Sequence, residues 1–275
     1  MDEAPLPILI TNPHCSGNIP QEILSRMRKC GEPETVLKKR LFSEGDPFTD
    51  LLYDLPAESI LRAPYSRFAV DLNRGRGEDG PDGVIKTTDF QLRPFYSPDY
   101  RIDALERERR LKAYYDPWHQ RVVDILSQGG IRFLLDGHSM SAKGPMLGPD
   151  LGKPRPALCL GNLGGVNGEP VVGQTASLAP PIARAVRDYA TKIVGRAFPN
   201  WDRDNLVLLN QPFDGGHIVE RYARPPYPHP VPGLLFEINR ALYLHEDAVE
   251  PIPGAIETWR GVLLDIVRFI LEILP

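Results

Sequence analysis

Residues 131–138, IRFLLDGH, place an unbroken apolar run directly before an acid, a glycine and a histidine. Apolar residues in succession, without polar alternation, are typical of a strand that is covered on both faces. The run therefore predicts a central strand of a mostly parallel sheet, with Asp136 and His138 at its carboxyl end. Because these two residues are two apart in a strand, their side chains point to the same face.

Five further segments show the same short apolar run followed by polar residues or glycine. They are 7–11 (PILIT), 67–72 (RFAVDL), 157–161 (ALCLG), 205–210 (NLVLLN) and 233–238 (GLLFEI). Helical patterns lie between them at 101–128, 179–198 and 255–274, and Pro117 is expected to interrupt or kink the first of these helices. The alternation predicts an α/β fold, a single domain over residues 1–275 with three layers, in which a mixed, mostly parallel sheet lies between helices.

The composition argues against several classes of partner. The chain has 275 residues and a formal net charge of -4, and its Lys and Arg residues are scattered, so we expect no nucleic-acid partner. No apolar run approaches the roughly 20 residues that span a bilayer, and the first residues lack the pattern of a secretory signal. With three widely spaced cysteines, Cys15, Cys30 and Cys159, these features predict a cytoplasmic protein with reduced thiols and no membrane partner. The sequence does not indicate the oligomeric state.

Reactive side chains follow four of the predicted strands. His14 follows the first, Asn73 and Arg74 follow the second, His138 ends the third, and Glu237 ends the last. Because active sites in such sheets form beyond the carboxyl ends of the strands, we expect these groups to meet at one edge. Zinc takes imidazole ligands beside a carboxylate and a water, and His14 and His138 match that preference. The alternative is that each histidine is a hydrogen-bonded structural residue.

Glu237 and Asp136, at the same edge, also have two interpretations each. Glu237 stands in an apolar strand, where a buried carboxylate is either used as a general base or paired with a cation such as Arg240. Asp136 either orients a histidine ligand or caps the turn that follows the strand. Arg74 offers a planar fork for a substrate carboxylate, with Asn73 as a neutral donor.

Six segments in chain order carry a resemblance to a known family. They are PHCSGNIP, YSRFAVDLNR, PWHQRV, LLDGHSM, LNQPFDGGHIVERY and FEINRALYLHE, and together they resemble the N-formylglutamate amidohydrolase family. That family is similar to zinc carboxypeptidases and aspartoacylases, which share a first-strand His, a DLNR-type segment, a later strand-end His and a late strand Glu. The resemblance implies a zinc-carboxypeptidase-like fold.

The resemblance also implies roles for individual residues. It implies one zinc ion, or another divalent ion, held by His14 and His138. Carboxypeptidases have a Glu three residues after the first His, and Gly17 stands there in this chain. Asp46 matches an acidic position of the family and is the expected third ligand, although it is also a candidate N-cap for the helix that follows it. His217 is expected to contact the substrate or the transition state, or else to satisfy a buried loop carbonyl.

The function implied is hydrolysis of the N-acyl, formyl-type amide of a small amino acid such as N-formylglutamate. The expected mechanism uses metal-activated water with Glu237 as general base and a small-molecule N-acyl amino acid as the partner. Two alternatives are a non-catalytic small-carboxylate binding protein on the same fold and a zinc carboxypeptidase. The proline-rich segments 144–156 and 225–232 depart from the family pattern, so we expect substrate choice to be decided there.

Overall fold

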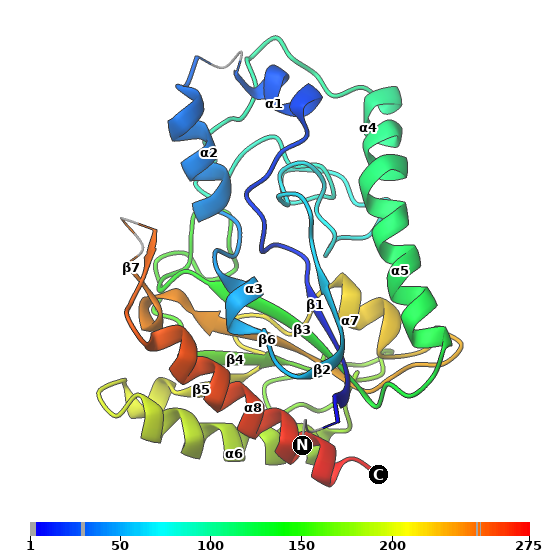
Figure 1. Cartoon of the computed structure of the whole chain (residues 1–275), viewed down its shortest axis with the longest axis vertical. Helices are drawn as coiled ribbons and strands as arrows, with labels where there is room; N and C mark the ends of the chain where they lie inside the picture. The colour runs from blue at the N-terminus through cyan, green and yellow to red at the C-terminus, as the bar shows by residue number, and fades with distance from the viewer. Residues whose placement is uncertain (1–3, 29–30, 246, 248) are drawn as a thin grey trace.

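A six-stranded sheet forms the centre of the molecule in the computed structural model, which describes residues 4–28, 31–245, 247 and 249–275 (Figure 1). Its strands are β1 (Leu6–Asn12), β2 (Ala57–Arg62), β3 (Phe133–Met140), β4 (Leu158–Gly161), β5 (Val207–Leu209) and β6 (Gly233–Asn239). The order across the sheet is β2-β1-β3-β6-β4-β5. The first four of these strands run parallel, whereas β4 is antiparallel to β6 and parallel to β5. The sheet is therefore mixed and mostly parallel, as predicted.

Helices cover both faces of the sheet, which explains the unbroken apolar runs of its central strands. On one face, α6 (Pro180–Ala197) and α8 (Ala255–Ile273) pack together against the alternate strand residues Ile8, Ile10 and Phe133. The other face, which carries Leu9 and Leu134, packs against α5 (Asp116–Ser127) and α7 (His217–Tyr222). The three-layer arrangement is confirmed.

The long helical pattern at 101–128 is divided as the position of Pro117 predicts. It consists of α4 (Ala104–Arg110), a π-helical turn η2 (Leu111–Tyr115) and α5, which has Pro117 in its first turn. A proline is tolerated there because its missing N–H has no partner to lose in the first turn of a helix. Gly129 and Gly130, both with positive φ, follow the end of α5.

A second region lies beyond the carboxyl ends of the parallel strands and contains α1 (Gln21–Met27), α2 (Glu34–Ser43) and the segment that leads from β2 to α4 (Figure 1). The strand predicted at 67–72 is wrong, because this stretch forms turns within that segment. Its apolar residues are nevertheless buried: Phe68 and Ala69 pack in a cluster with α1 and α2. The second strand is instead β2, a half-exposed edge strand with polar residues that hid it from a search for apolar runs.

The smaller elements complete the chain. They are α3 (Thr49–Leu52), the 3₁₀ turns η3 (Arg203–Asn205) and η4 (Arg240–Leu242), and the hairpin of β7 (Leu244–His245) with β8 (Glu250–Pro251). Cys15 and Cys159 are buried free thiols, whereas Cys30 lies outside the described residues. Within the described ranges, none of the helices combines the length and apolarity that a membrane crossing requires.

Candidate metal centre and active site

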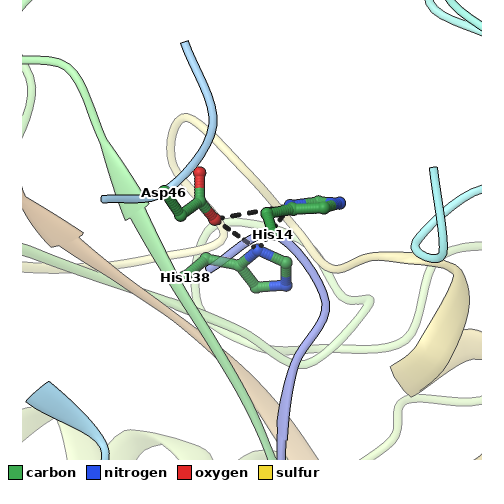
Figure 2. Close-up of side chains that lie close together, drawn as sticks. All are labelled: His14, Asp46 and His138. Carbon is green, nitrogen blue, oxygen red and sulfur yellow. Dashed lines mark hydrogen bonds and ion pairs between the residues drawn. The ribbon is translucent and has the colours of Figure 1, made fainter. Parts of the chain in front are cut away.

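Three side chains from separate parts of the chain converge at the carboxyl edge of the sheet (Figure 2). His14 lies two residues beyond β1, His138 lies in β3, and Asp46 lies in the loop between α2 and α3. The backbone N–H of Asp46 donates to the carbonyl of His14 over 3.0 Å, which fixes this loop against the end of β1. All three residues are buried, with 2% of each exposed.

The spacing of their ligand atoms suits a tetrahedral metal ion. Oδ2 of Asp46 lies 3.3 Å from Nδ1 of His14 and 2.9 Å from Nδ1 of His138, and the two Nδ1 atoms are 3.1 Å apart. Ligands held at about 2.0–2.1 Å by a tetrahedral zinc ion lie about 3.3 Å from one another. The donor set of two imidazoles and one carboxylate is also the type found in catalytic zinc sites.

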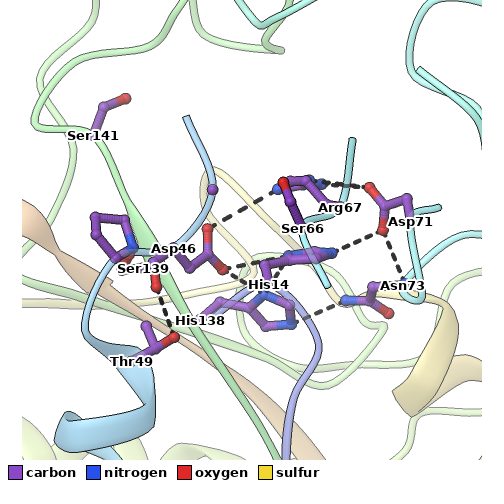
Figure 3. A network of polar contacts seen from close by, with 12 residues as sticks. His14, Asp46, Thr49, Ser66, Arg67, Asp71, Asn73, His138, Ser139 and Ser141 are labelled. Carbon is purple, nitrogen blue, oxygen red and sulfur yellow. Dashed lines mark hydrogen bonds and ion pairs between the residues drawn. The ribbon is translucent and has the colours of Figure 1, made fainter. Parts of the chain in front are cut away.

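Each histidine is oriented by a carboxylate on its other ring nitrogen. Nε2 of His14 lies 2.8 Å from Oδ1 of Asp71 (Figure 3). Nε2 of His138 lies 3.0 Å from Oδ2 of Asp136. Asp136 is held in turn by the hydroxyl of Thr11, which donates over 2.7 Å. A carboxylate that accepts the Nε2 proton leaves Nδ1 free to face the centre, as in metal sites with a carboxylate behind the histidine. The orienting role considered for Asp136 agrees with these contacts.

The sequence did not reveal the contact of Asp71 with His14. Its carboxylate lies in a cluster of cations, 2.7 Å from Nη2 of Arg67 and 3.2 Å from Nζ of the buried Lys86. Burial opposes its ionisation, but the charges of Arg67, His14 and Lys86 hold the pKa of Asp71 well below its usual range. Asp71 is therefore ionised and able to accept a hydrogen bond from the Nε2–H group of His14.

Asp46 does not cap the following helix. The N-cap of α3 is Phe48, without a side-chain hydrogen bond, so the capping alternative is wrong. Arg240 lies 3.3 Å from Oδ1 of Asp46 and also donates to the carbonyls of Ser43 and Gly45, which fixes the Asp46 loop. Burial opposes ionisation of Asp46 too, yet hydrogen bonds with His138 and His14 hold its pKa well below the usual range. Asp46 is therefore ionised between the two imidazoles and provides the anionic oxygen of the candidate centre.

Glu237 stands directly opposite His138 in the register of β3 with β6, so the two side chains share one face of the sheet. The pairing with Arg240 that was considered for it does not occur, because Arg240 contacts Asp46 instead. Its buried Oε2 atom has no hydrogen-bond partner among the described residues. Burial raises the pKa of Glu237 to about 7, although the charges of His138 and Arg155 oppose this shift. An unpaired carboxyl group with this pKa is suited to proton transfer near neutral pH.

Asn73 connects the centre to α7 through the two ends of its amide. Nδ2 lies 3.0 Å from Oδ2 of Asp136 and 3.0 Å from Nε2 of His138, and Oδ1 accepts from the backbone N–H of Ile218 over 2.8 Å. Gly216 approaches so closely that an added Cβ would lie 2.3 Å from Nδ2 of Asn73. The packing of α7 against Asn73 thus explains Gly216, the second glycine of the GGH segment, whereas a Cβ added at Gly215 would lie 2.3 Å from the side chain of Leu163.

Arg74 and His217 have different positions relative to the cavity into which the candidate centre opens. Arg74 lines it and is held by Asp82, whose Oδ2 lies 2.7 Å from Nη2 of the arginine. The structure does not bring His217 to the cavity, because this residue lines a separate hollow with Arg221 and Arg224. His119 is buried in the interior, where it contacts the carbonyl of Leu72 and the hydroxyl of Tyr222.

The candidate centre opens into a cavity of about 360 Å³. This volume lies in the range of small-molecule sites, about 300–1,000 Å³. The cavity is lined by four arginines that the chain brings from distant positions, Arg67, Arg74, Arg155 and Arg240. Five acidic residues also line the cavity, Glu44, Asp46, Asp82, Glu237 and Asp247, so the arginines provide local binding points for anionic groups and not a net positive lining.

Fold and site together define an α/β protein with a buried His–Asp–His group, suited to a metal ion, at the carboxyl edge of a mostly parallel sheet. The model of the N-formylglutamate amidohydrolase family matches residues 6–244, and the chain belongs to this family. The resemblance noted from the sequence motifs is confirmed.

Individual relatives agree with this assignment. The chain is 27% identical over 256 residues to an N-formylglutamate deformylase of Pseudomonas aeruginosa, covering 88% of this chain and 84% of the relative. A Pseudomonas putida protein of the same name is 27% identical over 258 residues, covering 88% and 83%.

Solved structures show the same fold. The crystal structure of an N-formylglutamate amidohydrolase from Ralstonia eutropha aligns with a TM-score of 0.69 at 20% identity, over 98% of this chain and 96% of that one. A gene product of Agrobacterium tumefaciens aligns with a TM-score of 0.62 at 17% identity, over 96% and 90%. The predicted α/β class is therefore confirmed.

Proposed function

We propose that this protein hydrolyses the formyl amide of an N-formyl amino acid, with N-formylglutamate as the substrate and a zinc ion held by His14, Asp46 and His138. The observation that carries the proposal is the convergence of three metal-ligand atoms beside the unpaired carboxyl group of Glu237. The names of the relatives, N-formylglutamate deformylase, support the choice of substrate.

The donor set fits a zinc ion in chemistry as well as in spacing. Asp46, Asp71 and Asp136 surround the two imidazoles, so the centre favours positive charge between them. When bound, a divalent cation would polarise the amide carbonyl and lower the pKa of a water molecule toward about 7. The protein's part is to hold the two Nδ1 atoms and the Asp46 carboxylate in place through these contacts.

Glu237 is the proposed general base and acid. Its carboxylate lies across the strand pair from His138 and has an oxygen without a protein partner. In the ionised form it takes a proton from the attacking water, and it then passes that proton to the nitrogen of the leaving amino acid. Its elevated pKa makes both transfers favourable near pH 7.

Two arginines have proposed roles at the reacting amide. Arg74 lines the cavity in an orientation fixed by Asp82 and would bind the α-carboxylate of the substrate. Arg67 is anchored through Nε and Nη2 to Asp71, and its Nη1 atom faces Asp46 at 4.0 Å. This nitrogen is positioned to stabilise the negative charge that develops on the amide oxygen. The amide of Asn73 is occupied by protein groups, so we assign it to holding Asp136 and α7 in place.

The test combines metal content with release of free amine. Purified parent protein should contain near-stoichiometric zinc and release glutamate from N-formylglutamate, and His138→Ala should lose both. His229→Ala replaces an exposed histidine that does not line the cavity. It is the matched control and should retain both.

The outcomes separate the proposal from its alternatives. Metal-free parent protein that is folded and inactive would contradict the zinc mechanism and favour the small-carboxylate binding protein. Release of C-terminal residues from peptides, without release of amine from N-formyl amino acids, would favour the carboxypeptidase.

A further inference from the structure

Arg155 is a cavity residue to which the mechanism assigns no task. It lies in the proline-rich segment 144–156, just before β4. Because β4 is antiparallel to β6, the start of β4 lies at the edge where β6 ends, near Glu237. Asn239, the last residue of β6, connects the end of β6 to the start of β4, because its Nδ2 atom donates a hydrogen bond to the carbonyl of Arg155 over 3.1 Å. Arg155 therefore lines the same cavity as the proposed metal ligands, at the side formed by β4 and β6.

The guanidinium of Arg155 is held rigidly from one edge. Nε and Nη2 each lie 2.8 Å from a different oxygen of Asp150, a bidentate pair. The guanidinium group also lies over the ring of Phe213, with its Cζ atom 4.9 Å from the ring centroid. Only 4% of Arg155 is exposed, so these contacts fix a buried cation in one orientation.

The remaining edge of the guanidinium is weakly used. Among the residues that the structure describes, Nη1 has one neutral hydrogen-bond partner, the hydroxyl of Ser141 at 3.3 Å. Ser141 also lines the cavity and lies beyond the end of β3, apart from the three ligands (Figure 3). A guanidinium nitrogen with one long, neutral contact retains donor capacity for an anion, and its fixed plane reduces the entropy lost when that anion binds.

We propose that Arg155 is a specificity-determining residue that binds a second carboxylate of the substrate, so that the enzyme selects N-formyl amino acids with acidic side chains. The inference rests on the proposed function, which places the first carboxylate on Arg74. Arg155 and Arg74 come from different segments that line the cavity, the loop before β4 for Arg155 and the loop after residue 73 for Arg74. A substrate with a carboxylate at each end of a short chain satisfies both.

The test compares N-formyl-L-glutamate with N-formyl-L-glutamine, which has the same shape without the second charge. The double variant Asp150→Asn/Arg155→Gln removes the cation and its partner together, so no buried acid is left unpaired. We expect the ratio of kcat/KM for glutamate over glutamine to fall about 10- to 100-fold, the usual effect of losing a hydrogen bond to a charged group. Lys143→Gln, which removes an exposed cation directly before the 144–156 segment, is the control and should leave the ratio unchanged.

A ratio that stays within threefold in the double variant, while the parent prefers glutamate, would overturn the role of Arg155 and leave the proposed hydrolysis standing. A parent that cleaves no N-formyl amino acid would overturn the hydrolysis instead. Arg155 is then tested by calorimetric binding of L-glutamate and L-glutamine to zinc-loaded protein. A preference for glutamate that disappears in the double variant supports the role of Arg155, and absence of any preference in the parent refutes it.

Discussion

Replacing Asp71 by Asn tests whether the carboxylate behind His14 maintains the metal centre. The new amide can still accept from Nε2 of His14 through its oxygen, but its NH₂ group must then face Arg67 and Lys86. Those two cations lie 2.7 and 3.2 Å from the present Oδ2 atom. Residue 71 is fully buried, so water cannot accept a hydrogen bond from the NH₂ group of the variant. We expect His14 to lose its fixed orientation as a result.

The expected loss can be expressed as a binding constant. Removing an outer carboxylate from a metal-bound histidine typically weakens metal affinity by about 10- to 100-fold. At about 1.4 kcal/mol for each factor of ten, this corresponds to about 1.4–2.8 kcal/mol of zinc binding free energy. Both proteins are compared at the same free zinc concentration, above both dissociation constants. The increase in the free energy of unfolding that zinc causes should then be smaller for the variant than for the parent by the same amount, about 1.4–2.8 kcal/mol.

The assay is competition for zinc with a chromophoric chelator at neutral pH, together with thermal unfolding of both forms with and without zinc. Asp89→Asn is the matched control, because Asp89 is also fully buried and pairs with two arginines, Arg40 and Arg93, but contacts no proposed ligand. It should lower the stability of the metal-free protein and leave zinc affinity within twofold. Equal zinc affinity of Asp71→Asn and the parent, or an equal loss in Asp89→Asn, would refute the orienting role.

Three further predictions address catalysis and the core. Glu237→Gln should lower kcat for amine release by about 10²- to 10⁴-fold, as loss of a general base does, with zinc content by elemental analysis equal to that of the parent. The ionised form of Glu237 is the active base, so kcat/KM should rise with pH and then level off. The midpoint of this rise should lie near the elevated pKa of about 7, or below it, because a bound cation would lower the pKa of Glu237. A pH profile of Glu237→Gln that keeps the same rise on the acid side would contradict the assignment. Trp259→Ala removes the largest fully buried side chain of the core and should lower the free energy of unfolding by about 3–5 kcal/mol, measured by urea denaturation, and a loss below 1 kcal/mol would show that α8 is not tightly packed on the sheet.

The sequence by itself determined the central strands and the histidines at their ends. Strands covered on both faces require unbroken apolar runs, so β1, β3 and β6 are visible as local patterns that place His14, His138 and Glu237 at one edge. The amphipathic helices α6 and α8 are equally local, because one apolar face per helix is enough to predict them. The motifs also identified the family before the fold was known.

Only the tertiary structure decided the identity of the polar partners at that edge. The apolar run at 67–72 belongs to a buried loop, because burial can come from packing against α1 and α2 as well as from a sheet. Asp46, Asp71 and Arg155 lie outside the helices and strands, and the direction of a side chain in a loop depends on contacts with residues distant in the chain. The placement of His217 outside the cavity has the same cause, since its helix is positioned by the contact of Asn73 with Ile218 and Gly216. Local patterns determine which residues reach the edge of the sheet, whereas long-range packing determines which of their atoms meet.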